Sequence, residues 1–153
     1  MKTRYVPRPL QMLVLVGAAA IGTRAAAAVA TPTLVRFEVS PLDHATPLTV
    51  ALDSCTTLIK AGRLAEADAA CAQAIRAAQT ERAQSRTWVV SDRPYLGLAA
   101  AYNNRAVLHY LQGNLTEAAA DSSRALNVAQ TPALASTAAF IEAKLHRTAG
   151  VIQ

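Results

Sequence analysis

The stretch AYNNRAVLHYLQGNLTEAAADSSRAL, residues 101–126, places small residues at wide and regular intervals. Their spacing is A-x6-G-x4-A-x6-A, and the four residues are Ala106, Gly113, Ala118 and Ala125. The earlier stretch CTTLIKAGRLAEADAACAQAI, residues 55–75, has the same spacing, set by Cys55, Gly62, Ala67 and Ala74. Two copies of one spacing indicate an internal repeat.

Each copy predicts a pair of antiparallel helices. In the first copy, Thr46-Pro47 provides an N-cap followed by proline at the first helical position. Gly62 then ends the first helix, where a left-handed residue is needed, and Gly113 does the same in the second copy. The small residues fall where the two helices of a hairpin cross, because a larger side chain would force the backbones apart. A further helix is expected from Thr131-Pro132 to about Gly150.

This pattern resembles the tetratricopeptide repeat family, with one 34-residue unit over residues 48–81 and another over 99–132. The alanines after each turn match the family pattern, whereas Ala51 replaces the family's aromatic residue in the first copy. The resemblance implies an all-α fold for residues 46–150, made of two helical hairpins and a C-terminal capping helix. An insertion over residues 79–94 separates the two units.

The resemblance also implies a function. Such repeats are non-enzymatic modules whose first helices line a concave face that holds a peptide of a partner protein. In the second unit, the positions that face this groove correspond to Asn103, Val107, Tyr110 and Leu111. An alternative is that these residues contact the insertion or the N-terminal leader. Two repeats make a short groove, which a homodimer would extend.

The leader, residues 31–45, contains a strand-like pattern over residues 34–41, in which Val35, Phe37 and Val39 alternate with polar residues. A single strand is not stable by itself. The segment could pair with residues 87–90, lie extended along the helices, or remain only partly ordered.

Residues 1–30 are typical of a secretory signal peptide. A basic head is followed by the apolar run Met12–Gly22 and by the small residues Ala28-Val29-Ala30. Cleavage after Ala30 would leave no membrane span and would place the protein in a bacterial periplasm or outside the cell; the alternative is a retained membrane anchor. Without this segment the chain keeps 11 basic and 10 acidic residues, a balance too even for a nucleic-acid partner.

Cys55 and Cys71 are the only cysteines, and each lies eight residues from Arg63 at the turn. At about 1.5 Å of rise per residue they stand level on antiparallel helices, in phase with the facing apolar stripes. An exported chain meets the redox condition for a disulfide between them. The alternative is two buried free thiols that pack as small apolar residues.

The remaining residues do not indicate catalysis. The three histidines, His44, His109 and His146, are not spaced as metal ligands, and no glycine-rich phosphate loop or nucleophile elbow is present. We therefore expect no cofactor, no metal and no enzymatic activity. The expected function is binding of a protein or peptide, and the alternative is a small structural subunit assembled permanently in an envelope complex.

Overall fold

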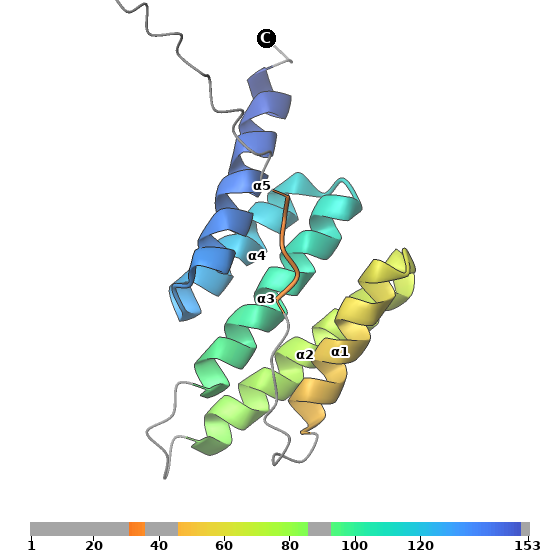
Figure 1. The fold of residues 1–153 in the computed structure, drawn as a ribbon, viewed down its shortest axis with the longest axis vertical. Coiled ribbons are helices and arrows are strands. Elements are labelled where there is room, and N and C mark those ends of the chain that lie inside the picture. The colour runs from red at the N-terminus through yellow and green to blue at the C-terminus, as the bar shows by residue number, and fades with distance from the viewer. Residues whose placement is uncertain (1–30, 36–45, 86–92, 151–153) are drawn as a thin grey trace, which may run out of the picture.

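The structure is a computed structural model that describes residues 31–35, 46–85 and 93–150. These residues form an all-α arrangement in which successive helices pack as antiparallel pairs (Figure 1). The helices are α1 (Pro47–Lys60), α2 (Leu64–Ser85), α3 (Arg93–Leu111), α4 (Leu115–Val128) and α5 (Pro132–Gly150). The predicted signal peptide, residues 1–30, and the strand-like residues 87–90 lie outside the described residues.

The helix ends follow the predicted signals. Thr46 caps α1, and its side-chain oxygen accepts a hydrogen bond from the Thr49 N–H at 3.2 Å. The turns after α1 and α3 contain Gly62 with φ +72° and Gly113 with φ +83°, a backbone region that disfavours every residue with a Cβ. α5 begins at Pro132, after the Thr131 that was predicted to open it.

The repeated small residues lie inside the helical pairs. The five alanines of the two repeats are at most 1% exposed: Ala67, Ala74, Ala106, Ala118 and Ala125. The first helices of the two pairs also approach closely, because a Cβ on Gly97 of α3 would lie 2.6 Å from Leu48 Cδ2 of α1. The repeated alanines are therefore buried, as expected for small residues packed between helices.

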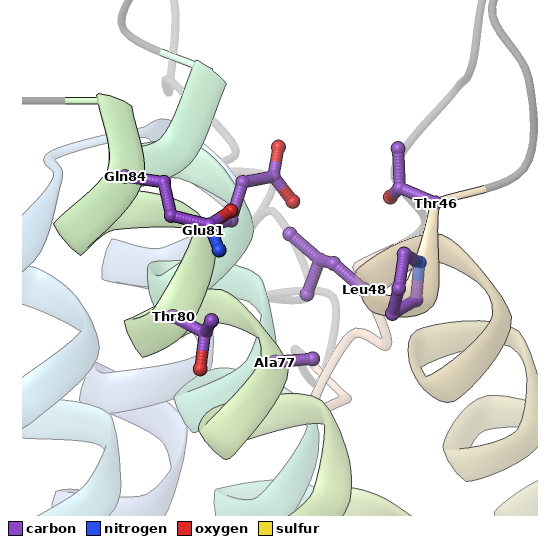
Figure 2. Close-up of a pocket in the computed structure, with 7 residues that line it drawn as sticks. Thr46, Leu48, Ala77, Thr80, Glu81 and Gln84 are labelled. Atoms are coloured by element: carbon purple, nitrogen blue, oxygen red, sulfur yellow. The ribbon is translucent and has the colours of Figure 1, made fainter. Parts of the chain in front are cut away.

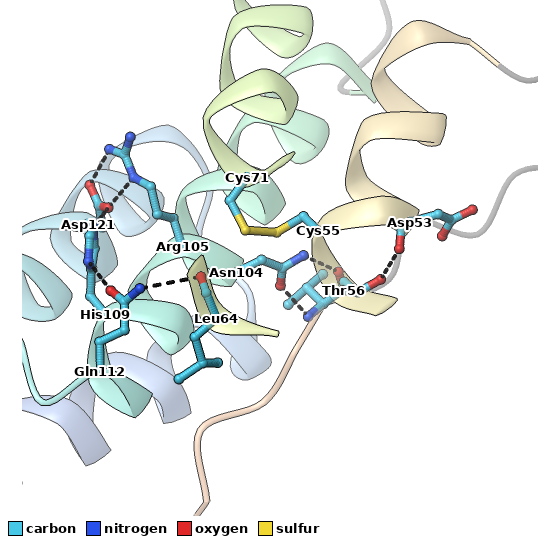
Figure 3. The surroundings of a disulfide bond; sticks show 11 residues. Asp53, Cys55, Thr56, Leu64, Cys71, Asn104, Arg105, His109, Gln112 and Asp121 are labelled. Carbon is cyan, nitrogen blue, oxygen red and sulfur yellow. Dashed lines mark hydrogen bonds and ion pairs between the residues drawn. A yellow bond between two sulfur atoms is a disulfide. The ribbon is translucent and has the colours of Figure 1, made fainter. Parts of the chain in front are cut away.

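The predicted Cys55–Cys71 disulfide is present and joins α1 to α2 (Figure 3). The two Cα atoms are 4.8 Å apart, and both residues are fully buried. They belong to an apolar cluster that also contains Ile59, Ala67 and Leu108, so this cluster packs the first hairpin against α3. A buried disulfide indicates an oxidising compartment outside the cytoplasm.

The insertion predicted over residues 79–94 is partly helical. α2 continues to Ser85 and is 22 residues long, whereas its counterpart α4 has 14. Residues 86–92, within that insertion, lie outside the described part of the chain. Among the helices that the structure describes, none combines the length and the apolar character that crossing a membrane requires.

The described part of the leader is not paired into a sheet. Residues 31–35 are extended without belonging to a strand, and they lie across α3, where Figure 1 draws them in orange. For these residues the structure therefore has one of the three predicted arrangements, an extended chain along the helices. The rest of the strand-like pattern, residues 36–41, lies outside the described residues.

Candidate functional site

Asn104 of α3 holds the main chain of Val35 at two points. Its side-chain oxygen accepts a hydrogen bond from the Val35 N–H at 2.9 Å, and its side-chain nitrogen donates to the Val35 carbonyl oxygen at 3.0 Å. A side-chain amide carries the same donor and acceptor as a peptide group. Asn104 therefore contacts Val35 as a neighbouring β-strand would.

Thr33 is held in the same way by two side chains from different helices. Asn103 donates from Nδ2 to the Thr33 carbonyl oxygen at 2.8 Å, and the Oγ1 of Thr137 in α5 accepts from the Thr33 N–H at 3.2 Å. In an extended chain, the N–H and C=O groups of alternate residues point to the same side. Thr33 and Val35 thus present one edge of the segment to the helices.

We call Asn103, Asn104 and Thr137 the extended-chain site. All three are fully buried. Side-chain amides and hydroxyls inside a protein require hydrogen-bond partners, and residues 31–35 supply them. The site thus combines buried polar groups from α3 and α5 with a peptide backbone that comes from about 70 residues or more away in the sequence.

The side chains of the segment enter apolar surroundings on both sides of the backbone contacts. Leu34 packs against the cluster that contains the disulfide and Leu108. Val35 packs against two other clusters, which include Leu98 of α3 and Leu134 of α5. The site therefore contacts both the main chain of residues 33 and 35 and two consecutive aliphatic side chains.

One polar atom of the site is not satisfied. Among the described residues, the Asn103 side-chain oxygen is buried and has no hydrogen-bond partner. A buried acceptor without a partner costs about 1–3 kcal/mol. Residues 31–35 thus leave one acceptor of the extended-chain site unused.

The four groove positions predicted from the sequence have different surroundings. Asn103 forms part of the extended-chain site, whereas Val107 is 3% exposed and lies in the core. Tyr110 packs edge-on against Phe140 of α5, with ring centres 5.2 Å apart. Leu111 is 48% exposed. Of these four, Asn103 is the one that the structure hydrogen-bonds to residues 31–35.

Sequence reasoning missed Asn104 and Thr137. A signal for Asn104 was available, because two adjacent asparagines stand in the middle of a helix that is otherwise rich in Ala and Leu. Asparagine is a poor helix former, so such a pair in a helix interior indicates a specific role for the side chains. Thr137 carries no comparable signal.

A second polar cluster joins α3 to α4 around the buried carboxylate of Asp121, which is 1% exposed (Figure 3). Arg105 donates to both carboxylate oxygens, with distances of 2.6 and 2.9 Å. Arg124 donates at 2.5 Å, and His109 Nε2 lies 3.7 Å from the carboxylate. The hydrogen bonds to Asp121 raise the pKa of Arg105 above its ordinary value. The carboxylate is therefore fully paired, and its ion pair with Arg105 links α4 to α3.

Figure 2 shows a pocket of about 420 Å³ between the start of α1 and the C-terminal half of α2. Leu48 and Ala77 form its apolar part, and Glu81 is the one carboxylate among its described lining residues. The hydroxyl of Thr80 donates to the Arg76 carbonyl oxygen at 3.0 Å, within its own helix.

Across residues 31–35, 46–85 and 93–150, no three acidic, histidine or cysteine side chains gather in a way that could hold a metal ion. In comparisons with known proteins, no family model, no curated protein and no solved structure matches this chain.

Proposed function

We propose that the protein is an exported, non-enzymatic, tetratricopeptide-like module that binds an extended segment of a protein partner. The observation that carries this proposal is the two-point contact between Asn104 and the main chain of Val35. Contacts of this kind recognise a peptide by its backbone, and side-chain pockets beside them add specificity. α3 presents such a surface from a rigid helix.

The helical arrangement supports the family assignment within this proposal. In each of two successive antiparallel pairs, the turn after the first helix contains a glycine with positive φ, and the repeated alanines are buried. The asparagines lie on α3, the first helix of the second unit, which is where the resemblance places the peptide-binding face. Export is supported by the signal-like residues 1–30 and by the disulfide.

A second candidate function is that of an accessory subunit held permanently in an envelope complex. It is favoured by Tyr95 and Leu96, which are 42% and 39% exposed and are adjacent at the start of α3. With Val128 and Ala129 they line a second pocket, at the other end of α3 from Leu111. An exposed apolar patch of this kind is typical of an interaction surface.

Site-specific photocrosslinking in the native host tests the two functions. Leu111 follows Asn104 by seven residues, so it lies on the same face of α3, and it is exposed. A photoreactive residue there should give one discrete adduct. The same residue at Gln73, an exposed position of α2, should give none. Adducts from Leu96 with none from Leu111 would favour the accessory subunit, and the absence of an adduct at Leu111 would contradict the binding module.

A concentration series by light scattering separates the two functions independently. A binding module should be a stable monomer when purified alone. A permanent subunit whose apolar surface has lost its cover should instead associate as the concentration rises.

A further inference from the structure

We propose that residues 31–35 are an internal ligand of the extended-chain site, and that a partner binds there by replacing them with its own extended segment. This inference rests on the proposed function and makes it more specific. It assigns the partner's chemistry from the contacts that residues 31–35 make.

The contacts define the segment that the site accepts. The N–H groups at the positions of Thr33 and Val35 both donate to the site, so neither position tolerates proline. The positions of Leu34 and Val35 require adjacent aliphatic side chains, because both pack into apolar clusters. The side chains of Thr31 and Thr33 are exposed, so the side chains of a partner segment at these two positions can vary. The ligand is therefore an extended segment with two consecutive aliphatic residues at the positions of Leu34 and Val35.

Three observations indicate that the internal ligand is replaceable. The helices pack directly against one another in successive pairs from α1 to α5 and bury their small residues there, so this packing does not depend on residues 31–35. Leu34 and Val35 are only partly buried, whereas the residues they contact are core residues. The Asn103 side-chain oxygen has no partner among the described residues while the segment is bound. A ligand that supplies a donor to this oxygen would bind more tightly than residues 31–35 do.

Residues 31–35 compete favourably with a free peptide because they are covalently attached to the helical domain. Residues 36–45 connect it to α1, so its binding is intramolecular, and a free peptide competes with a high effective concentration. Cutting this connection should remove the advantage without changing any contact in the site.

The experiment uses the full exported chain, folded and oxidised, with a protease site introduced between residues 36 and 45. A labelled synthetic peptide of residues 31–38, TPTLVRFE, is added before and after the cut, and binding is followed by fluorescence anisotropy. We expect the peptide to bind at least about tenfold more tightly after the cut, once the cleaved segment has been removed by gel filtration.

Two methylated peptides serve as matched probes. N-methylation at Val35 removes the N–H that Asn104 accepts and should weaken binding about tenfold. N-methylation at Leu34 should change binding less than about threefold, because the Leu34 N–H has no hydrogen-bond partner among the described residues.

Two protein variants test the contacts of the site by changing residues of the helices and not of the peptide. Thr137→Val keeps the side-chain shape and removes the acceptor for Thr33, so it should weaken peptide binding about fivefold or more. Thr56→Val changes an equally buried threonine whose hydroxyl donates to the Asp53 carbonyl oxygen in α1, and it should leave binding unchanged.

Several outcomes would overturn the proposal. If the cut chain loses its helical circular dichroism when the segment leaves, residues 31–35 are part of the structural core. Failure of the cleaved segment to exchange, or equal binding of the two methylated peptides, would also contradict it. If the uncut chain forms a dimer that exchanges residues 31–35 between copies, the occupant is a second copy and not a partner.

A variant covers the case in which cleavage damages the protein. Leu34→Asp weakens docking of the internal ligand and changes no residue of the helices. In the uncut chain it should raise the affinity for TPTLVRFE about tenfold, and unchanged affinity would contradict the proposal. If the peptide binds tightly but no adduct forms at Leu111 in the host, the proposal that residues 31–35 are an internal ligand stands. The proposed cellular function is then refuted.

Discussion

Replacing Cys55 and Cys71 together by alanine removes the bridge between α1 and α2 and keeps both helices intact. The bridge closes a loop with a sequence separation of 16 residues. Releasing a loop of this size returns about 3 kcal/mol of conformational entropy to the unfolded chain. Both sulfur atoms are also buried, and their loss leaves a small void that adds about 1 kcal/mol.

The double variant should therefore lose about 3–4 kcal/mol of unfolding free energy, out of the roughly 5–15 kcal/mol typical of a small domain. In urea, with a slope of about 1–3 kcal/mol per M, this corresponds to a midpoint lower by about 1–4 M. The denaturant slope should rise, because the unfolded chain without a crosslink is more expanded. Since Leu34 packs against the apolar cluster that contains both cysteines, removing the disulfide should also weaken the docking of residues 31–35.

Equilibrium urea unfolding of the oxidised protein, the reduced protein and the double variant measures this loss. Reductant should lower the unfolding free energy of the native protein to within about 1 kcal/mol of that of the double variant, and the remaining difference is the contribution of the void. Reductant should leave the unfolding free energy of the double variant unchanged. A loss below about 1 kcal/mol would refute the entropy argument. Two reactive thiols per chain in denatured, unreduced protein from the exported fraction would refute the disulfide itself.

Three further predictions concern the Asp121 cluster, the contact between Gly97 and Leu48, and export. Asp121→Ala removes the buried acceptor of Arg105 and Arg124, whose side chains are 24% and 55% exposed and can be hydrated instead, so it should lower the unfolding free energy by about 1–3 kcal/mol, measured in urea. Gly97→Ala brings a Cβ against Leu48 and should cost about 1–2 kcal/mol, although alanine favours a helix, whereas Gly150→Ala, which meets nothing within 4 Å, should cost nothing. Mass spectrometry of protein from the native host should give a chain that begins at Thr31, and an uncleaved chain recovered from the cytoplasm would contradict export.

The helices and the disulfide could be predicted because their signals are local. Thr46-Pro47, Gly62 and Gly113 each act through the backbone geometry of their own turn. The pairing of Cys55 with Cys71 follows from helical rise and from the position of one turn. The buried alanines follow from the repeat spacing, which sets the positions at which the helices cross.

The extended-chain site could not be predicted because its partners are distant in the sequence. Val35 meets Asn104 across 69 residues, and Thr33 meets Thr137 across 104. The family resemblance selected the concave positions of α3, which include Asn103 but not the adjacent Asn104. An alternating pattern in residues 34–41 indicates an extended chain, yet it does not identify the surface that the chain covers.

Amide hydrogen exchange of residues 33–35, followed by NMR on labelled, oxidised protein that begins at Thr31, tests the central claim most directly. The side-chain groups of the extended-chain site accept the N–H groups of Thr33 and Val35, while the Leu34 N–H between them has no partner among the described residues. We predict that Thr33 and Val35 exchange at least about tenfold more slowly than in a free peptide, and that Leu34 exchanges much faster than both. Equal exchange of all three amides at the rate of a free peptide would contradict the account.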